Sequence, residues 1–236
     1  MNETNVSELT VILSDDHIVV VDKPAGLPTL PDGYDKAAPH LAQVLAPQFG
    51  KIWIAHRLDR GTSGVMVVAR TAEAHRNLNM QFDGREVRKA YHALIVGEPP
   101  WEEYTVRFPL RADGDRKHRT IVDHGKGKPA VTHLRVLERH GAVALVEARP
   151  ETGRTHQIRA HLAALRLPVL GDALYGGADV SAAPRGADGP VIDRTALHAH
   201  SLAFRHPVTE APLAFEAPYP PDFARAQRAV RNLEQG

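Results

Sequence analysis

The feature that most constrains the fold of this chain is a series of short apolar runs, each about the length of a β-strand. Five of them are Ile18–Val21, Ile52–Ala55, Val65–Ala69, Ala90–Val96 and Val143–Ala148. They follow one another with few helical segments in between, whereas a parallel α/β fold alternates strands and helices. The series therefore predicts an α+β fold with a largely antiparallel sheet.

Four amphipathic segments predict the helices, because their apolar residues recur at the spacing of one helix face. They are His40–Ala46, stopped by Pro47; Thr71–Phe82, capped by Thr71; a segment after Gly153 with Ile158, Leu162 and Leu165 inward; and a final helix with Phe223, Val230 and Leu233. Residues 1–10 and 177–194 are expected to be flexible, since the first are polar and the second are rich in Gly, Ala, Asp and Pro.

The composition excludes several classes of protein. The chain has no cysteine, which rules out disulfides, thiol catalysis and zinc sites with sulfur ligands. No apolar run is long enough to span a bilayer, and Met1–Glu8 lacks the basic and apolar pattern of a signal peptide. We therefore expect a globular protein of the cytoplasm.

The net charge of +1 does not indicate a nucleic-acid partner, but basic residues cluster locally. One cluster lies in Arg111–Lys128, a second is Arg85, Arg88 and Lys89, and a third is Arg154, Arg159 and Arg166. Each is either an ordinary solvated surface or a surface that holds a polyanion such as RNA.

The segment Ala55–Gly64 is the best candidate for chemistry. It is a polar, glycine-containing connection between two apolar runs, and it carries Asp59 between Arg57 and Arg60. A carboxylate on such a connection is held firmly and remains reachable, as a nucleophile or base must be. The alternative is a surface turn that only closes a hairpin.

Four stretches of this chain resemble the motifs of the RluA-type pseudouridine synthases, in the same order and spacing. They are Asp22–Gly26; His56–Gly64, the signature; Arg88–Leu94; and Thr152–Leu162 with Gly171-Asp172 and Tyr175-Gly176. Leu197–Pro207 resembles the closing strand of that family. The similarity covers roughly residues 20–210 and implies one catalytic domain over 1–236, with two lobes sharing a mixed, mainly antiparallel sheet and a central cleft.

The resemblance also implies the reaction. Asp59 would attack a uridine, at C6 of the base or at C1′ of the sugar, and the base would detach, turn and rejoin the ribose through C5. No metal and no cofactor take part. Tyr91 would pack against the uracil, although a tyrosine on an apolar strand is usually a core residue. Arg159 would pair with Asp59 and keep it ionised, the alternative being an exposed helix arginine.

The resemblance and the basic clusters together imply the RNA-binding residues, which are Arg57, Arg60, Arg88, Lys89, Arg154 and His156. Arg57 would enter the space that an extruded base vacates, because its planar guanidinium can stack on bases; a plain ion pair is the alternative. Arg154 would hold a phosphate together with the N-terminus of the helix that follows.

Two further expectations concern what is missing. The 14 histidines lack the spacing of a metalloprotease site, so we expect no metal.

Lys23 lies too near the N-terminus for the RNA-binding S4 domain that many family members carry. The catalytic domain would then grip a stem-loop of ribosomal or transfer RNA by itself, as a monomer without an obligatory protein partner. A non-catalytic RNA-binding or chaperone protein on the same scaffold is the second hypothesis.

Overall fold

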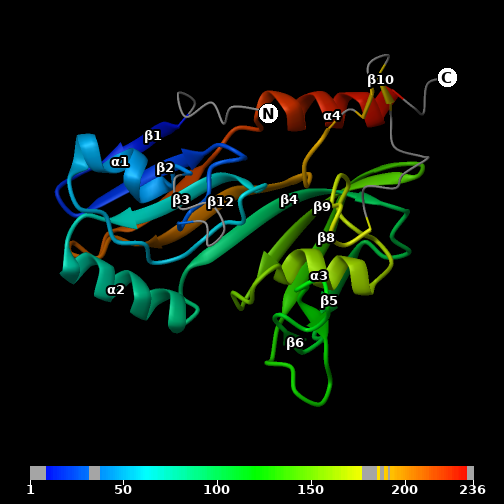
Figure 1. Cartoon of the computed structure of the whole chain (residues 1–236), viewed down its shortest axis with the longest axis horizontal. Helices are drawn as coiled ribbons and strands as arrows, with labels where there is room; N and C mark the ends of the chain where they lie inside the picture. The colour runs from blue at the N-terminus through cyan, green and yellow to red at the C-terminus, as the bar shows by residue number, and fades with distance from the viewer. Residues whose placement is uncertain (1–8, 32–37, 177–184, 187–188, 191, 233–236) are drawn as a thin grey trace. The chain divides into compact units, whose positions relative to one another are not determined.

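The chain folds into two compact units, and each unit is assembled from two separate stretches of sequence. The first contains Met1–Lys89 and Ala199–Pro218, and the second contains Ala90–His198 and Tyr219–Gly236. The computed structural model describes residues 9–31, 38–176, 185–186, 189–190 and 192–232 (Figure 1).

The first unit is an antiparallel sheet with two helices. Its strands are β1 (Thr10–Ser14), β2 (Ile18–Lys23), β3 (Ser63–Ala69), most of β12 (Leu197–Arg205) and β13 (Pro212–Glu216). β2 pairs with β1 and β3, and β12 pairs with β13, all antiparallel. The helices are α1 (Leu41–Phe49) and α2 (Ala72–Asp83). Thr71 caps α2 by accepting the N–H of Ala74, as predicted.

β3 and β12 lie very close together at Gly64. The backbone of Gly64 has φ of +117°, and a Cβ atom there would come within 2.2 Å of the Ala199 carbonyl oxygen. Only glycine permits this approach, so Gly64 fixes how tightly these two strands of the first unit pack.

The second unit is a longer antiparallel sheet covered by two helices. Its strands are most of β4 (Arg88–Val96), β5 (Glu103–Val106), β8 (Thr132–His140) and β9 (Val143–Pro150), in the order β4-β9-β8-β5. The helices are α3 (Gln157–Ala164) and α4 (Pro221–Asn232). Their apolar residues Ile158, Leu162, Phe223 and Val230 join one core with β4 and β9, which confirms the inward faces predicted for them.

A separate two-stranded hairpin belongs to the second unit. It consists of β6 (Leu110–Arg111), β7 (Ile121–Val122) and the segment that returns to Lys128, which bridges to Leu110. The hairpin extends from the region of α3 (Figure 1). Leu110 and Val122 pack with Ala160 of α3. A second short pair, β10 (Arg185–Gly186) with β11 (Gly189–Pro190), falls in the segment expected to be flexible; the rest of 177–191, and residues 1–8, lie outside the described residues.

The α+β class and the antiparallel sheet are confirmed, but two element predictions are wrong. Ile52–Ala55 is not a strand; only Trp53 makes a β-bridge, with Ala69. The helix expected to stop at Pro47 continues to Phe49. Within the described part of the chain, no helix has both the length and the apolar character to cross a membrane.

Candidate active site

The loop that carries Asp59 is fastened to a neighbouring loop on both sides of the carboxylate. On one side, the Thr29 hydroxyl donates to the Leu58 carbonyl at 2.9 Å and accepts the Leu58 N–H at 3.2 Å. On the other, the Gly26 N–H donates to the Arg60 carbonyl at 2.8 Å, and Arg60 Nε donates to the Gly26 carbonyl at 3.1 Å. Asp59 is half-buried between these two attachments.

The neighbouring loop is itself held by a buried lysine. Lys23 has no exposed surface, and its ammonium donates to the carbonyls of Pro24 and Leu27, each at 2.8 Å. Buried charges persist in proteins only when they are hydrogen-bonded. The motif Asp22–Gly26 therefore builds the support on which the Asp59 loop rests, a role that the sequence alone did not indicate.

His56 anchors the start of the Asp59 loop. Its ring stacks on Phe82 of α2 with centroids 4.5 Å apart, and its Nε2 accepts the Val67 N–H at 3.2 Å. Burial, helped by the nearby charge of Lys89, lowers the pKa of His56 to about 3. His56 is therefore neutral at physiological pH, as an acceptor at Nε2 requires.

The basic residues of the first unit differ in their surroundings. Arg57 and Arg88 are exposed, and Arg57 forms no ion pair with any described residue. Arg60 is exposed but its Nε is used in the attachment to Gly26. Lys89 is half-buried over the Phe82 ring, with Nζ 5.9 Å from the centroid, and burial lowers its pKa.

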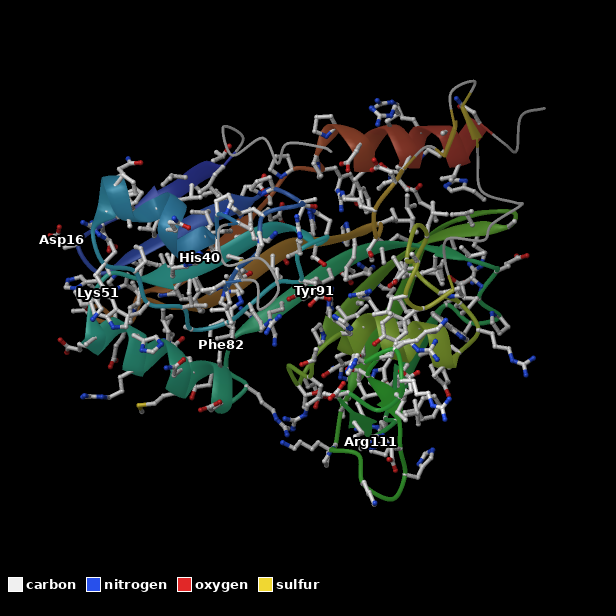
Figure 2. All side chains as sticks on the ribbon, in the orientation of Figure 1. Asp16, His40, Lys51, Phe82, Tyr91 and Arg111 are labelled. Carbon is white, nitrogen blue, oxygen red and sulfur yellow. The ribbon has the colours of Figure 1, made fainter. Side chains whose placement is uncertain are left out.

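The second unit carries the two other residues predicted to be catalytic. Tyr91 is half-buried on β4, where it faces Ala148 of β9 and packs against the core (Figure 2). Arg159 lies on α3 with only 8% of its surface exposed, so the alternative of an exposed helix arginine is wrong. The pairing of Arg159 with Asp59 of the first unit stays a prediction.

Arg159 is held by a buried carboxylate of its own unit. Its Nε and Nη2 donate to the two oxygens of Asp172, at 2.6 and 2.9 Å. Asp172 is fully buried and also accepts the N–H groups of Leu174 and Tyr175, both at 3.2 Å. Such a two-pronged pair fixes the plane of the guanidinium. The sequence motif contained Asp172, but nothing in its spacing indicated this partner.

Arg154 and His156 lie just before α3, in a loop pinned by Gln157. Its side-chain oxygen accepts from the Thr152 hydroxyl at 2.7 Å and the Arg154 N–H at 3.0 Å. Arg154 Nε donates to the Pro129 carbonyl at 3.2 Å. α3 begins at Gln157 rather than directly after Gly153, so Arg154 precedes the helix by a short loop.

In the basic cluster Arg111–Lys128, ion pairs engage some of the basic residues and leave others exposed. Arg111 pairs with Asp123 at 2.6 Å and Arg119 with Asp115 at 2.7 Å; Figure 2 labels Arg111 on this hairpin. Four exposed cations of the hairpin have no carboxylate partner among the described residues: Arg116, Lys117, Lys126 and Lys128. This reduces the basic surface of the hairpin to those four side chains.

His161, one of the 14 histidines, shows how a histidine of this chain is used in the fold. His161 is fully buried, with its two ring nitrogens bonded to the Thr132 hydroxyl and the Phe108 carbonyl, each at 2.9 Å. Since Nε2 must donate to the carbonyl, Nδ1 accepts. Over the residues that the structure describes, no group of three or more His, Asp or Glu could hold a metal ion.

Comparison with known proteins gives one consistent result. A family model described as RNA pseudouridylate synthase matches residues 17–164. The chain is 43% identical to the ribosomal large subunit pseudouridine synthase D of Xanthomonas campestris, over 94% of this chain and 70% of that protein. It is 38% identical to the dual-specificity RNA pseudouridine synthase RluA of Pasteurella multocida, over 89% of this chain and 93% of that one.

A solved structure agrees with the fold. The human RNA pseudouridylate synthase domain containing 1 superposes with a TM-score of 0.75 at 27% identity, covering all of this chain and 98% of that one.

Proposed function

The chain belongs to the RNA pseudouridylate synthase family and is therefore an RNA-modifying isomerase, and we propose that it converts a uridine of large-subunit ribosomal RNA to pseudouridine with Asp59 as the nucleophile. The ribosomal substrate follows from the name of the Xanthomonas campestris relative. Transfer RNA is the alternative substrate, and the same experiment distinguishes the two.

The proposed reaction rearranges bonds without adding or removing atoms. The Asp59 carboxylate attacks C6 of the base or C1′ of the sugar, and the bond between N1 and C1′ breaks. The base turns, C5 bonds to C1′, C5 loses its proton, and N1 gains one. A carboxylate suffices for these steps, because it can form a covalent intermediate and then leave.

The observation that carries the proposal is the double attachment of the Asp59 loop. Thr29 and Gly26 fasten the residues on either side of Asp59, so the backbone that carries the carboxylate is held in place. A nucleophile held in this way has less freedom to lose in the transition state. A turn that only closed a hairpin would need no such support.

Arg159 and Tyr91 complete the proposed site. Asp172 holds the guanidinium of Arg159 through Nε and Nη2. The role proposed for Arg159 is that its positive charge favours the ionised form of Asp59, which is the form that attacks. Tyr91 would pack against the uracil and orient it.

Cationic side chains would bind the RNA, and one of them would help to extrude the target base. Target uridines in folded RNA are stacked, so the base must leave the helix before reaction. Arg57 is exposed and without an ion pair among described residues, which suits a side chain that fills the vacated space. Arg88, Arg154 and the four exposed cations of the hairpin would hold phosphates.

The test uses purified protein with transcripts of large-subunit ribosomal RNA and of transfer RNA, without cofactor. Asp59→Asn keeps the shape of the side chain and removes its charge, so pseudouridine formation should disappear while RNA binding persists. Asp16→Asn is the matched control, because Asp16 is an exposed carboxylate of the same unit. Substantial activity of Asp59→Asn, measured by mass spectrometry of digested RNA, would overturn the mechanism.

A further inference from the structure

Tyr175 connects the β6–β7 hairpin to the arginine of α3. Its hydroxyl accepts the Thr120 N–H at 2.8 Å and donates to the Thr120 carbonyl at 3.2 Å. Thr120 directly precedes β7, so these bonds attach the hairpin to Tyr175. The same hydroxyl lies 3.2 Å from Nδ1 of His156.

The three bonds use the full capacity of the hydroxyl. A tyrosine O–H has one proton to donate and two lone pairs with which to accept. Since the proton goes to the Thr120 carbonyl, the lone pairs accept the Thr120 N–H and the Nδ1–H of His156. Burial raises the pKa of Tyr175, so the hydroxyl keeps its proton at physiological pH.

The ring of Tyr175 lies against the guanidinium of Arg159. The Arg159 Cζ is 5.0 Å from the ring centroid, within the range of a cation–π contact. Asp172 holds one edge of the same guanidinium. Arg159 is therefore restrained on an edge by Asp172 and on a face by Tyr175.

The hairpin at the other end of this connection carries the exposed cations Arg116, Lys117, Lys126 and Lys128. Inside the hairpin, the Thr120 hydroxyl is buried and makes no hydrogen bond with a described residue. Two bonds of the attachment are made by the Thr120 backbone, and the Thr120 side chain also lies near enough to the Tyr175 hydroxyl to lower the pKa of Tyr175.

We propose that Tyr175 is a positioning residue that transmits the binding of RNA by the hairpin to the orientation of Arg159. This rests on the proposed function, because it takes the hairpin as an RNA contact and Arg159 as the partner of the nucleophile. RNA seated on the hairpin restrains Thr120, Thr120 restrains the Tyr175 hydroxyl, and the Tyr175 ring restrains Arg159. The hairpin then affects turnover as well as affinity.

The test is a double-mutant cycle on the full chain, because coupling between sites is demonstrated by non-additive effects. Tyr175→Phe removes the hydroxyl and keeps the ring over Arg159. The hairpin variant replaces Lys126 and Lys128 by Gln. Thr120→Val is the control, since it keeps both backbone bonds to Tyr175 and removes only the Thr120 hydroxyl.

Tyr175→Phe should lower kcat about tenfold with a small change in KM. The hairpin variant should lower kcat in the wild-type background but only raise KM when combined with Tyr175→Phe. Thr120→Val should keep the wild-type kcat. Hydrogen exchange of the Thr120 amide should be faster in Tyr175→Phe than in Thr120→Val, which shows that the attachment was released in a folded protein.

Additive effects on kcat, or a kcat of Tyr175→Phe equal to that of the wild type, would overturn the proposal. An unchanged exchange rate of the Thr120 amide would do so as well, and it can be measured without any activity. Asp59→Asn in the same assay distinguishes a failure of the proposed function from a failure of the role of Tyr175. If Asp59→Asn is inactive while the cycle is additive, only the role of Tyr175 is wrong.

Discussion

Asp172 fixes the orientation of the Arg159 guanidinium, although Asp172 itself is not expected to touch the substrate. Replacing it by Asn keeps the shape but breaks a pair whose carboxylate side chain is 1% exposed, which costs about 3–5 kcal/mol of stability for a buried pair. We expect Asp172→Asn to lower kcat by about 100-fold as well, because a small displacement of a catalytic group has that effect.

The matched control is Asp222→Asn. Asp222 forms the same two-pronged pair with Arg194 in the same unit, but neither residue is proposed to act on RNA. It should lower the melting temperature and leave kcat unchanged. Equal kcat values for the two variants, measured well below both melting temperatures, would assign Asp172 a purely structural role.

Arg57→Ala should slow modification far more than it weakens binding, because the proposed role of Arg57 is to offset the cost of extruding a base, a few kcal/mol. The loss should shrink on an RNA whose target uridine is already unstacked. Single-turnover rates on a stem-loop and on an unstructured RNA of the same sequence measure this difference. Equal losses on both would leave Arg57 as an ordinary phosphate contact.

His56 should make the stability of the protein depend on pH below neutrality. Burial lowers its pKa to about 3 in the folded protein, from an ordinary value of 6.5, so between these values the unfolded chain binds the extra proton. Stability is therefore lost as the pH falls below 6.5, by at most about 1.4 kcal/mol per pH unit, and is unaffected above it. Urea unfolding of wild type and His56→Gln at pH 7.5 and 5 should show a smaller loss for the variant.

The individual site residues show what could be predicted from the sequence and what could not. Asp59, Tyr91 and Arg159 could be named from motifs, and their catalytic roles stay predictions. The burial of Arg159 could not be foreseen, because helical spacing placed it on the polar side of α3. Its partner Asp172 and the Thr29 attachment come from elsewhere in the chain, and pairings of that kind depend on the tertiary fold.

At the scale of elements, the strands with long apolar runs were predicted well, and the exceptions have physical reasons. Ile52–Ala55 is apolar but is used for side-chain packing, with Trp53 and Ala55 against the core of the first unit, rather than for a strand ladder. α1 continues past Pro47 by only two residues, to Phe49, because a proline inside a helix removes one hydrogen bond and crowds the carbonyl four residues earlier; the Pro47 ring itself is exposed to solvent.

The exposed cations of the hairpin should set part of the salt dependence of RNA binding. Each phosphate contact contributes about −0.7 to the slope of log affinity against log salt for single strands. Replacing Lys126 and Lys128 by Gln should flatten the slope by about 1.4 if both bind phosphates. Arg225 and Arg228, exposed on α4, supply the matched control, and their replacement by Gln should leave the slope unchanged.

At the scale of the whole molecule, the α+β class followed from the sequence but the composition of the two units did not. Each unit combines residues far apart in the chain, and periodicity within short windows carries no information on such pairings. The final helix is an example: its amphipathic face was visible, whereas its membership of the second unit, with β4 and β9, was not.

Phe223→Ala tests how much α4 contributes to the second unit. Phe223 is fully buried in the core that also contains Leu94 and Val146. Removing such a side chain typically costs 3–5 kcal/mol, so we expect a loss of about that size. Denaturant unfolding measures it, with Arg225→Ala on the exposed side of α4 as the control. A loss below about 1 kcal/mol would show that α4 is not part of the cooperative core.

The discontinuous first unit has a consequence for biosynthesis. β3 needs β12 beside it, as the approach of Gly64 to Ala199 shows, yet more than half of the chain is translated between them. Proteins emerge from the ribosome N-terminus first, so the nascent chain must wait with an unpaired strand edge until residues 199–218 appear. The strand that follows the Asp59 loop, β3, therefore gains its second neighbour only after residues 199–218 have been made, whereas the attachments of the loop to Gly26 and Thr29 can form much earlier.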